Sequence, residues 1–218
     1  MSTIHAVSVR GSEQPLAVGK IIALGRNYGA HAREMGAPTD AAPIIFLKPP
    51  TTVVGPLQAI RIPPQTDRVE HEAELAVVIG TVTRNVKVED VGPHILGYTA
   101  ANDVTARDLQ RSDGQWTRGK GFDTFCPLGP AIDTELDPQE GLSIICRVNG
   151  EMRQSGSTSD MVFGVGELVS FVSSVMTLLP GDVVLTGTPS GVGPIRHGDR
   201  VEVEIEGVGV LLNPVVSA

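Results

Sequence analysis

The stretch His71-Glu72-Ala73-Glu74-Leu75-Ala76-Val77-Val78-Ile79-Gly80 is the most informative part of this chain. Every residue from Leu75 to Ile79 is apolar, and a short continuous run of this kind is typical of a β-strand that is buried on both faces. Two glutamates precede the run. Because side chains alternate across a strand, Glu72 and Glu74 would lie on the same side, with Cα atoms roughly 7 Å apart. Two like charges beside a buried strand repel each other and are costly to desolvate.

A bound cation would remove both costs, although a solvated strand end with two ordinary glutamates is the alternative. A third carboxylate favours the cation. Asp103 leaves the apolar stretch of residues 95–101 and precedes an expected helix, where it could instead serve as an N-cap. Three carboxylates without a set of histidines or cysteines describe a hard-oxygen site, which suits Mg²⁺, Mn²⁺ or Ca²⁺ better than Zn²⁺.

Strand patterns dominate the rest of the chain. Residues 200–206 alternate between apolar and charged side chains, and Gly207 allows a turn into a partner strand over residues 208–212. Residues 142–148 predict another strand, which is followed by Asn149-Gly150, a strong type I′ turn signal. We therefore expect a mainly β, α+β fold.

Three helices are expected among these strands. Residues 167–179 carry an apolar stripe at helical spacing, and Pro180-Gly181 would end that helix. Two shorter helices are expected over residues 28–35 and 104–110. Since the sequence has no internal repeat, low-complexity tract or charged linker, we expect one domain over residues 1–218, with a short segment of about residues 1–18 leading into it.

Charge and composition restrict the class of partner. The 218 residues carry a net charge of −8 and no cluster of lysines and arginines with interleaved aromatics, which argues against nucleic acid as a partner. An anionic substrate would need local positive charge, and a bound cation is its simplest source. No apolar run approaches 18 residues and the first residues lack a signal-peptide core, so we expect no membrane segment and a cytoplasmic location. The two cysteines show neither metal-ligand spacing nor a disulfide framework.

Three further features suggest chemistry. His31 and Glu34 would share one helix face, and such a pair can activate water, although a surface histidine with an incidental neighbour is the alternative. Lys120 lies between glycines close to aromatic residues, a setting in which a lysine is ordinarily a surface residue. The loop of residues 187–193 lacks the lysine of a phosphate loop, but it could offer amides and the Thr188 hydroxyl to a ligand.

Six short motifs together resemble the fumarylacetoacetate hydrolase superfamily, and the short N-terminal part resembles its small acylpyruvase branch. These motifs are Gly25-Arg26-Asn27-Tyr28, Phe46-Leu47-Lys48-Pro49, His71-Glu72-Ala73-Glu74-Leu75, Asp103-Val104-Thr105-Ala106-Arg107-Asp108, Lys120-Gly121-Phe122-Asp123 and Leu185-Thr186-Gly187-Thr188-Pro189. They span nearly the whole chain. The resemblance implies a β-sandwich roll with a few flanking helices and a homodimer.

The resemblance also implies roles for individual residues. Mg²⁺ or Mn²⁺ would bind Glu72, Glu74 and Asp103. His31, Glu34 and Lys120 would be catalytic, the first two as a dyad on a lid. The substrate's carboxylate and keto oxygens would be bound by Arg26, Arg107, Gln110 and Thr188. The stretch of residues 110–120 is shorter than in acylpyruvases and more like that of bacterial decarboxylase and isomerase relatives.

These inferences predict a metal-dependent hydrolase that cleaves a C–C bond in acylpyruvates such as acetylpyruvate or fumarylpyruvate, with a pyruvate enolate stabilised by the metal and Lys120. Oxaloacetate decarboxylation, or isomerisation and decarboxylation of an unsaturated keto-diacid in aromatic catabolism, would use the same enolate. A domain of another class, one that binds a metal or metabolite without turnover, would not need His31, Glu34 or Lys120. A structural Ca²⁺ site would use more backbone carbonyls.

Overall fold

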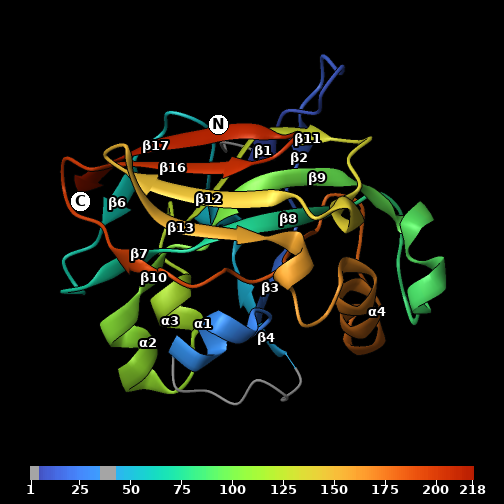
Figure 1. Cartoon of the computed structure of the whole chain (residues 1–218), viewed down its shortest axis with the longest axis horizontal. Helices are drawn as coiled ribbons and strands as arrows, with labels where there is room; N and C mark the ends of the chain where they lie inside the picture. Colours follow the sequence, from blue (N-terminus) through green and yellow to red (C-terminus); the bar gives the residue numbers. More distant parts are fainter. Residues whose placement is uncertain (1–4, 35–42) are drawn as a thin grey trace.

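The computed structural model describes residues 5–34 and 43–218, and most of this part of the chain is arranged in two large β-sheets with helices along one side (Figure 1). The seven-stranded sheet consists, in spatial order, of β4 (Ile44–Lys48), β3 (Ile21–Gly25), β14 (Val183–Leu185), β8 (Ala73–Ile79), β9 (Ile95–Asn102), β11 (Cys126–Asp133) and β5 (Val53–Val54). The five-stranded sheet consists of β13 (Glu151–Ser157), β12 (Ser143–Val148), β16 (Arg200–Ile205), β17 (Gly209–Ser217) and β6 (Ile60–Ile62).

Smaller elements complete the fold. A three-stranded sheet has the order β10 (Thr105–Ala106), β7 (Val69–His71) and β15 (Gly193–Pro194), and β1 (Ala6–Val7) pairs with β2 (Leu16–Ala17). The α-helices are α1 (Gly29–Glu34), α2 (Arg107–Asp113), α3 (Thr117–Lys120) and α4 (Val165–Val175). The 3-10 helices are η1 (Pro50–Thr52), η2 (Val88–Asp90), η3 (Gly92–His94), η4 (Pro138–Glu140) and η5 (Thr158–Asp160). The predicted mainly β, α+β class is confirmed.

The central strand β8 is buried along its whole length, as its apolar run predicts. Leu75 on one face packs in the core between the two large sheets, where Val203 of β16 also lies. Ala76 and Val78 on the opposite face belong to a second core, which β1 and β5 help to form. Near the far end of β8, Val77 and Ile79 pack beneath α4. Burial on both faces therefore fixes the position of the two glutamates at the start of the strand.

Several sequence-based boundaries agree with the structure. Strand β16 alternates buried side chains with exposed or half-buried ones, as expected. Strand β17 pairs with it from Gly209 to Pro214 and continues beside β6 to Ser217, five residues beyond the predicted end. The turn after β12 has positive φ at Asn149 (55°) and Gly150 (81°), which is the signature of a type I′ turn.

The three helices differ from their predicted boundaries. Helix α4 ends at Val175 rather than residue 179, because a backbone bridge to Thr83 holds Leu178 in extended structure and buries it, whereas Leu179 is 50% exposed. Helix α2 begins at Arg107 rather than 104, because residues 105–106 form β10. Helix α1 begins at residue 29, and the predicted end at residue 35 lies outside the described residues.

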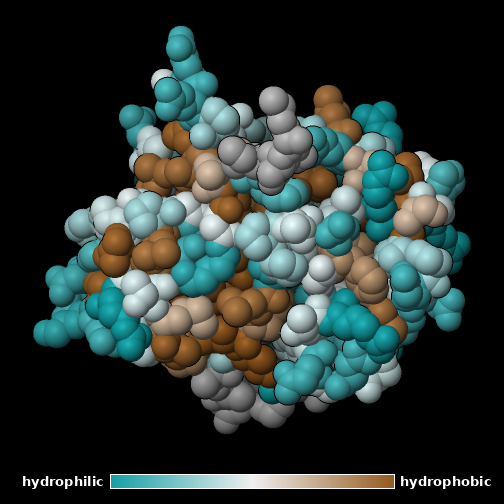
Figure 2. All heavy atoms as spheres, turned by 180° about the vertical axis from the view of Figure 1, so that it is seen from behind, coloured by the Kyte–Doolittle hydropathy of each residue, from teal (hydrophilic) through white to brown (hydrophobic). Residues whose placement is uncertain are grey.

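The face opposite to that of Figure 1 shows apolar side chains gathered in its lower half (Figure 2). Exposed apolar residues of the described chain include Leu47 on β4, and Phe171 and Val175 on α4. No helix in residues 5–34 or 43–218 combines the length and apolar character needed to cross a membrane.

Candidate active site

The site forms where two neighbouring segments of the chain pass from one sheet to another. Strand β7 belongs to the three-stranded sheet and β8 to the seven-stranded sheet, and Glu72 is the one residue between them. In the same way, Asp103 follows β9 and precedes β10. Because β8 pairs with β9 and β7 pairs with β10, both chains change sheets together. The backbone N–H of Asp103 donates to the carbonyl oxygen of Glu72 over 2.9 Å at this crossing.

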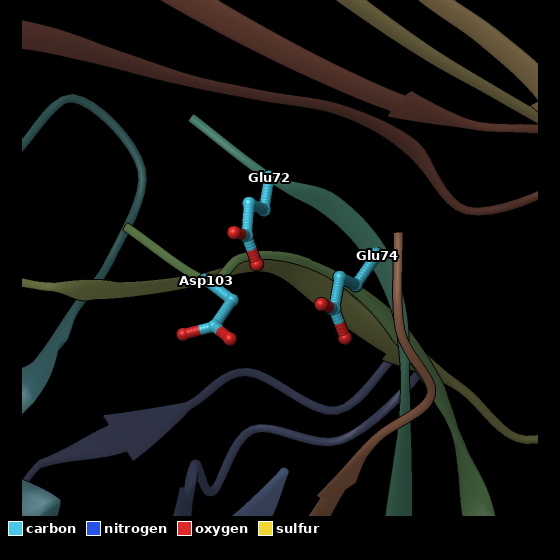
Figure 3. A group of neighbouring side chains, drawn as sticks. All are labelled: Glu72, Glu74 and Asp103. Atoms are coloured by element: carbon cyan, nitrogen blue, oxygen red, sulfur yellow. The ribbon is translucent and has the colours of Figure 1, made fainter. Parts of the chain in front are cut away.

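The three predicted metal ligands point into one gap (Figure 3). One carboxylate oxygen from each of Glu72, Glu74 and Asp103 lies within 4.8 Å of the other two, and the residues are only 5%, 2% and 1% exposed. Glu74 points to the same face of β8 as Ala76 and Val78. Asp103 does not cap a helix, since the residue before α2 is Ala106. The structure thus decides against the capping alternative.

Two buried lysines compensate part of this negative charge. The Lys120 ammonium donates to Glu72 Oε2 (2.8 Å) and to Asp103 Oδ2 (2.6 Å). Lys48 pairs with the other oxygen of Asp103 and also donates to the carbonyls of Val104 (3.2 Å) and Phe125 (2.7 Å). Lys48 therefore has a protein partner for each of its three N–H groups, whereas Lys120 has two such partners among the described residues.

Arg107, a predicted substrate ligand, has protein partners on all its nitrogens. Its Nε donates to Glu70 Oε2 (2.7 Å), one terminal nitrogen donates to Glu72 Oε1 (2.5 Å), and the other donates to Gln110 Oε1 (2.6 Å). Burial alone would raise the pKa of Glu72, but the Lys120 ammonium and then the Arg107 guanidinium hold it well below its usual range. In this structure Arg107 therefore orients Glu72.

Among the three carboxylates, Glu74 is the one that forms no ion pair with a described residue. Within the described residues its only hydrogen-bond donor is the backbone N–H of Gly187, at 2.7 Å. Burial, and then the negative charges of Asp103 and Glu72, raise the pKa of Glu74 well above its usual range. A divalent cation would supply the missing positive charge, and three carboxylates are hard-oxygen donors of the kind that Mg²⁺ and Mn²⁺ prefer. The donor set and its excess negative charge fit such an ion.

The predicted dyad is formed on helix α1. His31 Nδ1 lies 3.2 Å from Glu34 Oε2, and the His31 side chain is only 12% exposed. The Glu34 carboxylate also accepts the backbone N–H of Gly191, with distances of 3.2 and 3.3 Å to its two oxygens. Part of the loop of residues 187–193 thus holds the dyad in place.

A cavity of about 210 Å³ connects these groups. Nine of the ten predicted site residues line it, namely Arg26, His31, Glu72, Glu74, Asp103, Arg107, Gln110, Lys120 and Thr188. The tenth, Glu34, does not line the cavity but contacts His31, which does. The Thr188 hydroxyl donates to the carbonyl of Ala73 (2.8 Å), so it can only accept a hydrogen bond from a ligand. Arg26 has a backbone φ of 71°, and within the described chain its guanidinium forms no ion pair.

Sequence reasoning did not assign roles to several residues at the site. Lys48 ends an otherwise apolar strand, which was the available signal for a buried lysine. Glu70 continues the two-residue spacing of the two glutamates, and this spacing could have placed it beside Arg107. Trp116 lines the cavity and meets Phe46 edge to face at 5.2 Å, and Arg111 also lines the cavity, but neither residue belongs to a pattern that identifies a site.

Comparisons with known proteins agree with this geometry. The model of the fumarylacetoacetate hydrolase C-terminal family matches residues 20–216. The chain is 48% identical to the mitochondrial oxaloacetate tautomerase of Homo sapiens, over 90% of this chain and 66% of that protein.

Two solved structures are also similar. One is a 5-carboxymethyl-2-hydroxymuconate delta-isomerase from Mycobacterium smegmatis, 53% identical with a TM-score of 0.88, covering 94% of this chain and 81% of that one. The other is a fumarylpyruvate hydrolase from Pseudomonas aeruginosa in complex with Mn²⁺ and pyruvate, 36% identical with a TM-score of 0.92, covering 98% and 96%. The predicted roll-type fold is confirmed by these neighbours.

Proposed function

The chain belongs to the fumarylacetoacetate hydrolase family, and on this basis we propose that it is a divalent-metal enzyme that hydrolyses a C–C bond in acylpyruvates such as acetylpyruvate or fumarylpyruvate. Hydrolases, isomerases and tautomerases all occur among its relatives. The observation that carries the hydrolase proposal is that one cavity is lined both by His31, which contacts Glu34, and by the cluster of three carboxylates.

Glu72, Glu74 and Asp103 would hold Mg²⁺ or Mn²⁺. When bound, the ion would supply Lewis acidity toward the keto oxygen of the substrate. The similar fumarylpyruvate hydrolase of Pseudomonas aeruginosa was solved in complex with Mn²⁺ and pyruvate, and this supports both the type of ion and the type of product. Arg26, with no ion pair in the described chain, and the amide of Gln110 are the groups available to the substrate's carboxylate.

The dyad of His31 and Glu34 activates the attacking water. His31 removes a proton from a water molecule while Glu34 accepts the hydrogen bond of the opposite ring nitrogen, Nδ1, and holds the ring in that tautomer. The water oxygen bonds to the acyl carbon and the bond from that carbon to the methylene carbon breaks. Its electron pair leaves on the pyruvate fragment as an enolate, which takes the proton back from His31 at the methylene carbon. The Lys120 ammonium provides positive charge for the enolate oxygen.

A substrate panel tests this proposal. Acetylpyruvate, fumarylpyruvate and oxaloacetate are each offered to the purified chain with Mg²⁺, with Mn²⁺ and with EDTA, and pyruvate release is measured with a coupled dehydrogenase. Metal-dependent release of pyruvate from an acylpyruvate is expected. Tight binding of Mn²⁺ without turnover of any compound would instead identify a non-catalytic binding domain.

A second candidate is isomerisation or tautomerisation of an unsaturated or 2-keto dicarboxylate. The relatives named for these activities are 53% and 48% identical to this chain, whereas the named fumarylpyruvate hydrolase is 36% identical. Enol–keto conversion of oxaloacetate moves a proton without attack by water. His31→Gln separates the two candidates, because it removes the base that activates water but leaves the carboxylate cluster intact. Loss of hydrolysis with retention of tautomerisation in this variant is the result expected if the site performs both.

We also propose that residues 1–218 act as one catalytic domain and that two copies associate. The exposed apolar side chains Leu47, Phe171 and Val175 are available for such an association. Light scattering should then give a mass of twice 22.9 kDa, and a mass of 22.9 kDa would exclude the dimer.

A further inference from the structure

Gln154 is a buried amide that lies outside the cavity. It is 1% exposed and is the one buried residue of β13, whose other side chains are exposed or half-buried. The register of β12 and β13 shifts so that Cys146 faces Gln154 while Arg147 faces Met152, which leaves Arg153 without an opposite residue on β12. Because Gln154 stands opposite the buried Cys146, it shares the inward face of that residue and reaches Ala73 of β8.

The Gln154 side chain uses all its hydrogen-bonding capacity. Its Oε1 accepts the backbone N–H of Ala73 (3.0 Å) and meets His71 Nδ1 (2.9 Å), while its Nε2 donates to Thr188 Oγ1 (2.7 Å) and to the carbonyl of Pro189 (2.8 Å). A backbone N–H can only donate and a carbonyl can only accept, so the amide orientation is determined. Neither a carboxylate nor an apolar side chain could satisfy all four partners.

These bonds connect the two segments that meet at the carboxylate cluster. Ala73 lies between Glu72 and Glu74, while Thr188 and Pro189 follow Gly187, whose N–H is the one hydrogen-bond donor to Glu74 among the described residues. Gly187 has a φ of 91°, and a Cβ there would lie 3.0 Å from Asn27 Cβ and 3.2 Å from the carbonyl oxygen of Leu24. The loop therefore has little freedom to reach Glu74 in another way.

We propose that Gln154 is a positioning residue, which holds the loop of residues 187–189 against β8 so that the Gly187 amide fixes the Glu74 carboxylate for the metal ion. The inference rests on the proposed function. Gln154 contacts neither ion nor substrate, and it acts through Thr188 and Pro189. Removal of such outer hydrogen-bonding partners commonly lowers metal affinity by roughly 10- to 100-fold.

Gln154→Met tests this role, because it keeps the volume of the side chain and removes all four hydrogen bonds. We expect the affinity for Mn²⁺, measured by titration calorimetry, to fall roughly tenfold. Asn213→Leu is the matched control. Asn213 is also a buried amide, and its Nδ2 donates to the carbonyls of Gly55 (2.9 Å) and Gln58 (2.8 Å), away from the cavity. This variant should melt at a lower temperature but bind Mn²⁺ as the wild type does.

Gln154→Glu is the second variant. It keeps an acceptor for Ala73 and His71 but turns an oxygen toward the carbonyl of Pro189, so its affinity for Mn²⁺ should also fall. This variant keeps the inference testable if Gln154→Met fails to fold. Unchanged Mn²⁺ affinity in a folded Gln154 variant, with only the melting temperature lowered, would overturn the inference. If the wild type itself binds no Mn²⁺, the proposed function fails rather than the role of Gln154.

Discussion

Asp103 donates its backbone N–H to the carbonyl oxygen of Glu72 over 2.9 Å, at the level where both of their chains pass from the seven-stranded sheet to the three-stranded one. The main chain therefore fixes the relative position of these two residues before any ion arrives, and the Lys120 ammonium joins their carboxylates. A site that is held by strand pairing requires little rearrangement on binding, which favours tight coordination. Pairing of β8 with β9 also fixes the main chain of Glu74, but among the described residues its carboxylate accepts a hydrogen bond only from the Gly187 amide.

The different partners of the two glutamates predict opposite effects on the stability of the metal-free protein. Glu72→Gln leaves Lys120 and Arg107 with one fewer negative partner in a buried site, and it should destabilise the protein by about 3 kcal/mol. Glu74→Gln removes a buried charge that has no cation, so it should be neutral or stabilising. Urea unfolding in EDTA measures both free energies. Equal destabilisation by the two substitutions would contradict the charge distribution described above.

The raised pKa of Glu74 predicts a pH dependence of stability without metal. A carboxyl group whose pKa is higher in the folded state than its ordinary value of 4.5 stabilises the fold while it is protonated. This contribution is complete below pH 4.5 and is lost as the pH rises through the higher, folded-state pKa. In EDTA, the unfolding free energy of the wild type should therefore fall relative to that of Glu74→Gln as the pH rises above 4.5. A difference that is constant between pH 4 and 9 would show that Glu74 ionises normally.

Gly25 predicts a specific effect on the wall of the cavity. A Cβ at residue 25 would lie 2.7 and 2.9 Å from two ring carbons of Trp116, so Gly25→Ala must displace this ring. We expect a higher KM, a loss of about 1–3 kcal/mol of stability and a shift in fluorescence, because Trp116 is the one tryptophan of the chain. Gly92→Ala is the control, since nothing lies within 4 Å of its Cβ. An unshifted emission spectrum in the Gly25 variant would contradict the contact.

Local patterns predicted the parts of the fold and site that depend on adjacent residues. The apolar run of β8 and the spacing of Glu72 and Glu74 follow from the two-residue period of a strand, and the pairing of His31 with Glu34 follows from the helical period. The roles of Lys48 and Gln154 depend on strands that are distant in the sequence, so no local pattern contains them. Asp103 shows the same limit, because the N-cap alternative was excluded only by the pairing of β10 with β7.

The cysteines provide a measure of metal binding that does not depend on turnover. Burial raises the pKa of both the Cys126 and Cys146 thiols to about 12, so neither should react with a thiol reagent in the folded protein at pH 8. Two thiols per chain should react after unfolding in denaturant.

Cys126 lies close enough to the site for its pKa to respond to Lys48, Asp103 and Glu74, so a metal ion that stabilises the site should slow its exposure. If labelling requires global unfolding, Mn²⁺ at 100 times its Kd should slow the labelling of both thiols about 100-fold, because a ligand that binds only the folded state stabilises it by RT ln(1 + [L]/Kd). The measurement is the labelling rate in subdenaturing urea, with Mg²⁺ and with Mn²⁺. Rapid labelling of Cys126 at a rate that the ions leave unchanged would mean that the chain opens locally beneath the carboxylates, and that Glu72, Glu74 and Asp103 do not form the site that binds the ion.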